Sequence, residues 1–237
     1  WPEGTRAVSQ LRLSFRVRPA GLLSGLRGAQ TVHLDIVDYP GEWLLDLGLL
    51  GTSYDDWAAG RLALMADRPE AGAYLGQLAD TDGSGRLDEP TAQQLAQTYT
   101  ASLDAMQDAG HMDASPGRFL LPGDMAGSPA LTFAPLPPGA APRGSLRREF
   151  ARRYEAYKAR IVRPFFRDHF AQIDRQVVLV DVLGALGKGP QAVAELERVM
   201  GDLMVAFRPG TASWLNRLLG GRRVGKLLFA ATKADHL

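Results

Sequence analysis

The chain has 237 residues, of which 46% are hydrophobic and 22% are charged, and this composition excludes a wholly disordered protein. A formal net charge of +1 gives no global field toward nucleic acid or an anionic membrane. The lack of cysteine excludes disulfides and thiolate chemistry, and no apolar run reaches the roughly 20 residues of a membrane-spanning helix.

Two alternating segments near the N-terminus predict an antiparallel hairpin. Residues 11–17 read LRLSFRV, with apolar and polar side chains on opposite faces, as in a half-buried strand at a sheet edge. Residues 31–37 read TVHLDIV and repeat the alternation after a glycine-containing loop. We therefore expect the second strand to turn back on the first.

The middle of the chain is predicted to be mostly helical. Helical patterns cover residues 54–67, 71–79, 90–108 and 145–163, and Pro164 is expected to end or kink the last helix. The proline-rich residues 122–144 predict a long loop, either ordered or mobile.

The C-terminal part predicts a strand–helix–strand unit. Residues 176–180 (QVVLV) and 227–231 (LLFAA) are almost continuously apolar, which is typical of parallel strands covered on both faces. A helical pattern over 190–207 lies between them. The fold class is therefore α/β. The predicted parts are a core segment at 1–50, a mostly helical insertion at 51–172 and a second core segment at 173–237.

The first motif that carries chemistry is Asp38-Tyr39-Pro40-Gly41, of the form D-x-x-G, directly after an apolar strand. A carboxylate at a strand end can hold Mg²⁺, and a glycine lets its backbone N–H approach a terminal phosphate. The alternative is an ordinary Tyr-Pro-Gly turn.

The second motif is Thr232-Lys233-Ala234-Asp235, of the form T-K-x-D, directly after the last apolar strand. An aspartate here can accept two hydrogen bonds from guanine, whereas adenine has no such donor pair, so the motif favours GTP over ATP. The alternative is a solvated strand end. Both motifs follow strands, where ligands bind in open α/β sheets.

Thr5 is the candidate for a threonine that supplies an oxygen to Mg²⁺, with an ordinary loop threonine as the alternative. No phosphate-binding loop is recognisable. Residues 220–226 spell G-x-x-x-x-G-K, but Leu227 replaces the required Ser or Thr, and the segment leads into a strand instead of a helix. The chain opens on Trp1 and stops just after the second motif, so we expect a fragment of a longer protein.

Residues 80–88 (DTDGSGRLD) resemble a calcium-binding EF-hand loop. The position of the bidentate glutamate is occupied by Thr91, which favours a polar turn between helices. The four histidines show no metal-binding spacing. The sequence has no nucleophile elbow and no basic stripe for nucleic acid.

Four segments together closely resemble the YcjX-like P-loop NTPase family: 34–47, 121–136, 154–183 and 227–237. The resemblance implies a Ras-like P-loop NTPase core with a large helical insertion. It also implies GTP or GDP with Mg²⁺ as ligands, and a bacterial, cytoplasmic protein linked to phage-shock and stress responses. Members have often been labelled ATPases, but the T-K-x-D motif favours guanine.

The resemblance carries Asp38 and Gly41 onto the magnesium and γ-phosphate positions, and Thr232, Lys233 and Asp235 onto the base positions. Glu42 stands where Ras-like enzymes keep a water-orienting glutamine, so it is the candidate catalytic residue, and a carboxylate there could also slow hydrolysis. We therefore expect a slow GTPase or nucleotide switch when the protein is full length, with the fragment alone inactive.

Two alternatives stay open at this point. One is an ATPase of the same fold. The other is a helical partner-binding scaffold with a degenerate nucleotide core. The expected partners are a guanine nucleotide and an unknown protein effector, with no nucleic acid and no transmembrane segment, although peripheral membrane contact is left open.

Overall fold

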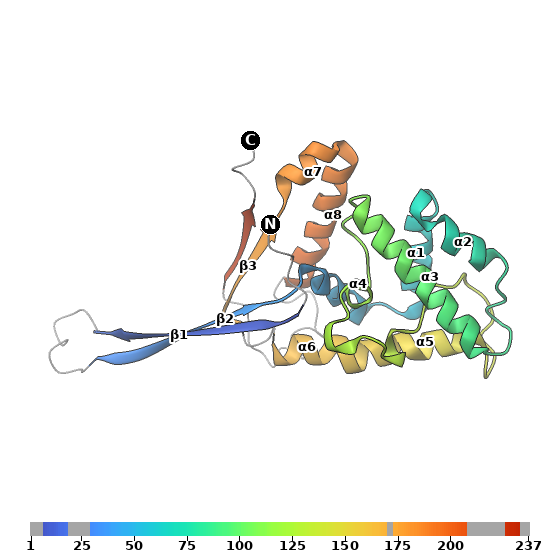
Figure 1. The fold of residues 1–237 in the computed structure, drawn as a ribbon, viewed down its shortest axis with the longest axis horizontal. Coiled ribbons are helices and arrows are strands. Elements are labelled where there is room, and N and C mark those ends of the chain that lie inside the picture. The colour runs from blue at the N-terminus through green and yellow to red at the C-terminus, as the bar shows by residue number, and fades with distance from the viewer. Residues whose placement is uncertain (1–6, 19–28, 170–172, 208–225, 233–237) are drawn as a thin grey trace. The chain divides into compact units, whose positions relative to one another are not determined.

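A computed structural model of the chain describes residues 7–18, 29–169, 173–207 and 226–232. The described residues form a mixed α/β structure with two two-stranded sheets and a larger set of helices (Figure 1). The predicted α/β class is confirmed at this level. The chain divides into two compact units, Trp1–Pro40 and Gly41–Leu237.

The first unit contains the predicted antiparallel hairpin. Strand β1 (Ser9–Val17) pairs with β2 (Gln30–Asp38), and Leu13 lies opposite Leu34. The alternation in both strands therefore places apolar residues on one face and mostly polar residues on the other, with Val37 as the apolar exception. On the polar face, the Arg12 guanidinium donates to both Asp35 carboxylate oxygens at 2.5 and 2.8 Å.

The prediction that the first strand is half-buried is wrong. The apolar side chains of β1 are 37% to 54% exposed, with Leu13 at the lower end and Leu11 at the upper end. A two-stranded sheet has no second layer of its own, so its apolar face depends on other elements for cover.

The second unit begins with helices. In chain order these are η1 (Gly41–Gly51), α1 (Tyr54–Met65), η2 (Pro69–Ala71), α2 (Gly72–Ala79), α3 (Glu89–Asp108), α4 (Gly117–Leu120), η3 (Gly123–Met125), η4 (Pro129–Leu131), α5 (Leu146–Tyr157), η5 (Lys158–Val162) and α6 (Arg163–Asp168). Residues 54–168 are called the helical block below. Its main helices begin at side-chain caps, since Ser53, Asp88 and Ser145 each accept a hydrogen bond from a backbone N–H three residues later.

Three predicted helices, at 54–67, 71–79 and 90–108, are confirmed with small shifts at their ends. The fourth continues beyond its expected end at 163. A π-helical turn, η5, interrupts the α geometry after Tyr157, and α6 then runs on to Asp168. Pro164 is the second residue of α6, directly after the π-helical turn, and it does not end the helix.

An aromatic core holds the helical block together. Trp57 stacks on Tyr154 with ring centroids 5.1 Å apart, and Phe119 meets Phe133 edge-on at 4.9 Å. Phe133 belongs to the proline-rich 122–144 segment and is fully buried. Residues 133–136 of that segment therefore belong to the core, whereas residues 137–144 are exposed.

Tyrosine hydroxyls attach the irregular segments to the helices. Tyr54 Oη donates to the Ala134 carbonyl at 2.8 Å, and Tyr74 Oη donates to the Pro135 carbonyl at 2.5 Å. Tyr99 Oη donates to the Ser115 carbonyl at 2.8 Å. Each buried hydroxyl thereby gains a partner, and each irregular carbonyl gains a donor.

The predicted strand–helix–strand unit is confirmed. Strand β3 (Arg175–Val180) pairs in parallel with β4 (Lys226–Ala231), and α7 (Val182–Lys188) and α8 (Pro190–Phe207) lie between them in sequence. The prediction that both faces of the strands are covered is wrong. In β3 the residues alternate, with Val178 and Val180 buried but Val177 and Leu179 56% and 69% exposed.

Candidate functional site

The D-x-x-G motif begins at the end of a strand, as predicted, and reaches the start of a helix that was not predicted. Asp38 is the last residue of β2, and Gly41 is the first residue of η1. A Cβ added at Gly41 would meet no atom of the structure within 4 Å. The fold thus gives no steric reason for glycine at this position, which leaves room for a functional one.

Helix η1, which follows the motif, is packed onto the helical block through Trp43. The indole Nε1 donates to the Leu121 carbonyl at 3.0 Å, and the Arg118 guanidinium lies 3.1 Å from the centre of the ring. Phe165 meets the same ring edge-on at 5.2 Å. The segment next to the motif is therefore tied to α4 and α6.

Asp46 is a second anchor of η1, and sequence reasoning missed it. The side chain is buried; its Oδ1 accepts from the Gly117 N–H at 2.8 Å and its Oδ2 accepts from Tyr157 Oη at 2.5 Å. Burial raises the pKa of Asp46 to about 6, against the opposing effect of these hydrogen bonds. The only sequence signal is a single acid inside the apolar run WLLDLGLL.

Glu42, the candidate catalytic residue, is held by the helical block through its side chain and its backbone. Gln107 Nε2, near the end of α3, donates to Glu42 Oε1 at 3.0 Å. Gly117 packs against the Glu42 backbone, because a Cβ at residue 117 would lie only 2.1 Å from the Glu42 carbonyl oxygen. Neither contact was predicted from the sequence.

The second motif begins at the end of β4, beside the end of β3. The Thr232 N–H donates to the Val180 carbonyl at 2.9 Å, and the Thr232 hydroxyl donates to the same oxygen at 3.3 Å. Asp181, the next residue after β3, caps α7 by accepting from the Gly184 N–H at 2.8 Å. Thr232 therefore extends the strand pairing, as expected for a motif at a strand end.

Three predicted site residues, Thr5, Lys233 and Asp235, lie outside the described residues. The spurious G-x-x-x-x-G-K sequence also lies there, except for its last residue. Lys226 is the first residue of β4, so this sequence leads into a strand and not into a helix. That placement confirms that it is not a phosphate-binding loop.

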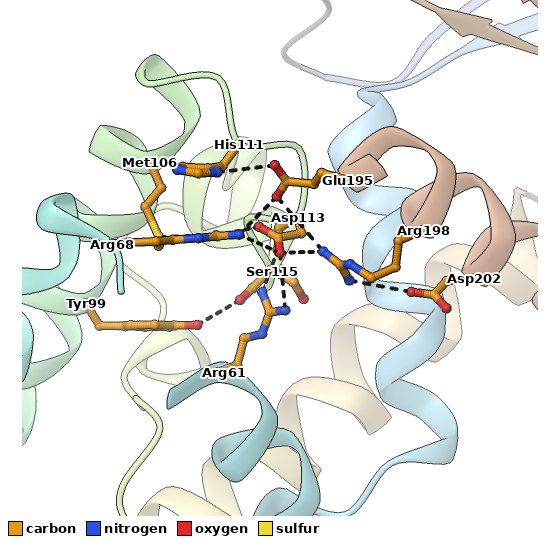
Figure 2. Close-up of polar contacts among 10 residues, drawn as sticks. All are labelled: Arg61, Arg68, Tyr99, Met106, His111, Asp113, Ser115, Glu195, Arg198 and Asp202. Carbon is orange, nitrogen blue, oxygen red and sulfur yellow. Dashed lines mark hydrogen bonds and ion pairs between the residues drawn. The ribbon is translucent and has the colours of Figure 1, made fainter. Parts of the chain in front are cut away.

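A buried charge cluster joins the helical block to α8 (Figure 2). Arg68 donates to both carboxylate oxygens of Asp113, at 2.7 and 3.1 Å, and Arg198 of α8 donates to Asp113 at 2.6 Å. Glu195 of α8 accepts from Arg68 at 3.1 Å and lies 3.2 Å from His111 Nδ1.

The protonation of this cluster follows from its arginines. Burial alone would raise the pKa of Asp113, but hydrogen bonds from Arg68 and the positive charge of Arg61 and Arg68 hold that pKa well below its usual value. Asp113 is therefore an anion at neutral pH, and its charge is balanced inside the protein. Three arginines face the carboxylates of Asp113 and Glu195, and this balance of charge indicates that the cluster stabilises the fold.

The EF-hand-like loop uses its oxygens internally. Asp82 accepts from the backbone N–H and the hydroxyl of Ser84 at 2.9 and 2.7 Å. Asp88 caps α3 by accepting from the N–H and hydroxyl of Thr91 at 3.0 and 2.7 Å. Within the described residues no group of three or more His, Asp or Glu side chains is arranged to hold a metal ion.

In the part of the chain that the structure describes, none of the helices combines the length and the apolar character needed to cross a bilayer.

Fold and motifs together define a mixed α/β protein in which one motif begins at the end of a strand and the other directly after a strand. The chain belongs to the YcjX-like family (DUF463), whose model matches residues 1–237. Over its whole length it is 39% identical to a protein named Ras-like GTPase YcjX from Shewanella oneidensis, covering 52% of that protein. It is 37% identical to the Ras-like GTPase YcjX of Escherichia coli, covering 53%. The chain therefore spans about half the length of these curated relatives.

Proposed function

We propose that this chain is part of a GTP-binding protein whose core is a Ras-like P-loop fold with the helical insertion at 51–172. The observation that carries the proposal is the placement of Asp38, the first residue of D-x-x-G, at the end of β2 and of Thr232, the first residue of T-K-x-D, directly after β4. The names of the two relatives support it, since both are Ras-like GTPases.

In this proposal Thr232, Lys233 and Asp235 bind the guanine base. The Asp235 carboxylate accepts from the two donors at the Watson–Crick edge of guanine, and the lysine stem lies over the ring. Adenine offers no matching donor pair, so a site built around this carboxylate rejects it. The specificity for GTP over ATP then depends on one side chain.

The phosphate end of the proposed site is formed by Asp38, Gly41 and Thr5. Mg²⁺ prefers hard oxygen ligands and is often held by one carboxylate together with substrate phosphates. The exposed carboxylate of Asp38 at the end of β2 fits that donor set, with Thr5 supplying a further oxygen. When bound, Mg²⁺ would neutralise charge on the β- and γ-phosphates.

Glu42 follows the proposed γ-phosphate contact Gly41, and we assign it the role of placing the attacking water. A carboxylate accepts hydrogen bonds but also repels a phosphate, so the expected turnover is slow. The whole protein is thereby proposed to be a slow GTPase or a nucleotide switch. Its link to bacterial stress responses is an expectation from the family.

The test is a titration of the full-length protein with fluorescent GDP and fluorescent ADP in the presence of Mg²⁺. We expect a strong preference for GDP that is lost in Asp235→Ala, because the base then loses both hydrogen bonds. Asp202→Ala is the matched control, since Asp202 is an exposed acid on α8 with 75% of its side chain accessible. Equal binding of GDP and ADP would contradict the proposal and favour an ATPase.

A further inference from the structure

Glu42 is attached to the helical block by a hydrogen bond that spans a long stretch of sequence. Gln107 lies 65 residues further along the chain, in the last turn of α3, and its amide Nε2 is 3.0 Å from Glu42 Oε1. The direction of this bond is set by chemistry, because an ionised carboxylate only accepts and the amide nitrogen only donates. The carboxylate is thereby oriented by a neutral donor.

The backbone of Glu42 is fixed by the same part of the protein. Gly117 lies so close to the Glu42 carbonyl that no side chain could replace its hydrogen. The N–H of Gly117 donates to Asp46, four residues after Glu42, at 2.8 Å. The start of α4 is therefore locked onto η1 at two points, which fixes the distance between Glu42 and the helical block.

From these contacts we infer that Gln107 is the positioning residue for Glu42, so that the helical block takes part in GTP hydrolysis. The inference rests on the proposed function, because Glu42 orients water only if Gly41 contacts the γ-phosphate. Gln107 holds Oε1 and leaves Oε2 without a hydrogen bond to any residue that the structure describes. A carboxylate held at one oxygen can present the other to a water molecule.

A purely structural role for Gln107 makes different predictions. The hydrogen bond is exposed to solvent, and such bonds contribute little to folding stability. If Gln107 were purely structural, its replacement would lower thermal stability or have no measurable effect. Either result would be the same whether or not Glu42 is present. A positioning role affects kcat, acts only when Glu42 carries its carboxylate, and leaves nucleotide binding unchanged.

The experiment is a double-mutant cycle in the full-length protein with Gln107→Ala and Glu42→Ala. We expect Gln107→Ala to lower kcat about tenfold, as a lost hydrogen bond to a charged group would, with KM for GTP and the affinity for GDP unchanged. In the Glu42→Ala background the same substitution should have no further effect on kcat, because the acceptor that Gln107 orients is gone.

Gln97→Ala is the matched control, since Gln97 is an exposed glutamine on the same helix and makes no side-chain hydrogen bond to the described residues. It should leave kcat unchanged. Gln107→Lys should retain much of the wild-type rate, because an ammonium group can also donate to Glu42. Thermal unfolding of every variant checks that the fold is intact.

The outcomes separate this inference from the proposed function. Loss of GDP preference in the wild-type protein would overturn the proposed function. GDP binding without GTP hydrolysis, or normal kcat in Gln107→Ala or in Glu42→Ala, would overturn the positioning role alone. An effect of Gln107→Ala that persists unchanged in the Glu42→Ala background would also overturn it, because Gln107 would then act independently of Glu42.

Discussion

Asp46 shows how a single side chain can link η1 to the helical block. Its two carboxylate oxygens contact Gly117 and Tyr157, which lie 71 and 111 residues further along the chain. The cost of burying the carboxylate outweighs these hydrogen bonds, so the pKa of Asp46 rises to about 6. The folded protein therefore favours the protonated form of Asp46 more than the unfolded chain does.

This shift has a definite effect on stability. Between pH 4 and pH 6 the unfolded chain releases the Asp46 proton while the folded chain retains it, so the free energy of unfolding falls as pH rises. A shift of about two pKa units corresponds to about 3 kcal/mol. We expect Asp46→Asn to gain about that much stability relative to wild type between pH 4 and pH 7, measured by urea unfolding.

The test is how the difference in unfolding free energy between Asp46→Asn and wild type changes with pH. Any effect of the amide that does not depend on pH is the same at both pH values and cancels. Gln97→Ala, which replaces an exposed residue on α3 that carries no titratable group, should show no such change. A difference between Asp46→Asn and wild type that is the same at both pH values would contradict the assigned shift.

The location of the described motif residues at strand ends was predictable from sequence because it depends on the local pattern, whereas their role in a nucleotide site stays a prediction. Asp38 and Gly41 follow an alternating strand, and Thr232 follows an apolar one, so their location at strand ends could be read directly. The partners of Glu42 and Asp46 were not predictable. They come from distant segments, and neither the hydrophobic pattern nor residue spacing says which distant side chains will meet.

At the scale of elements, the charge cluster connects helices that are far apart in sequence. Asp113 lies between α3 and α4, Arg68 follows α1, and Arg198 belongs to α8. The Asp113 side chain is 4% exposed, and those of Arg61 and Arg68 are 14% exposed. Because these charges are largely removed from water, they depend on one another for compensation.

Removing Asp113 should therefore be costly. In Asp113→Ala, three arginines lose their shared carboxylate, and we expect the free energy of unfolding to fall by about 3 to 5 kcal/mol. Urea unfolding at neutral pH measures the loss. Asp202→Ala, which removes an exposed acid 3.8 Å from Arg198 in the same cluster, should cost less than about 1 kcal/mol. Similar losses in both variants would contradict the structural role of Asp113.

Most elements could be predicted, and the exceptions have physical explanations. Long helices with caps and an apolar stripe, such as α3, leave a clear periodic signal. Helix η1 leaves none, because its apolar residues surround it on most sides. Helix α7 has only seven residues, too few to establish a period. The π turn before Pro164 was missed because no simple sequence pattern encodes it.

At the scale of the whole molecule, two strand faces remain apolar and exposed. In the hairpin these include Leu13 and Leu34, which face each other and are 37% and 48% exposed. In the other sheet they include Val177 and Leu228, which are 56% and 58% exposed. Contiguous apolar surface of this kind favours association in water.

We therefore expect the 237-residue chain to self-associate, and the double variant Leu13→Thr, Leu34→Thr to do so less. Sedimentation velocity over a range of concentrations measures the change. The matched control is Ser14→Thr with Thr31→Ser on the polar face of the same hairpin, which should leave association unaltered. A chain that stays monomeric at all concentrations would contradict this expectation.

The order of elements along the chain was predicted correctly: hairpin, helices, then a strand–helix–strand unit. What failed was the expected cover of the strands. The alternation in β1 and the continuous apolar run in β3 indicate which strand faces are apolar, but they do not indicate which element covers those faces. The boundaries at 1–50, 51–172 and 173–237 stay a prediction.

The tyrosine contacts with the irregular segments place unequal demands on the two partners. Tyr54, Tyr74 and Tyr99 donate to carbonyl oxygens, and every amino acid carries one. These bonds therefore do not depend on which side chains stand at residues 134, 135 and 115, so long as the backbone keeps its path. Replacing one of these tyrosines by phenylalanine, by contrast, leaves a carbonyl without its donor. The hydrogen bonds that hold the path of these segments are thus specified by side chains on the helices.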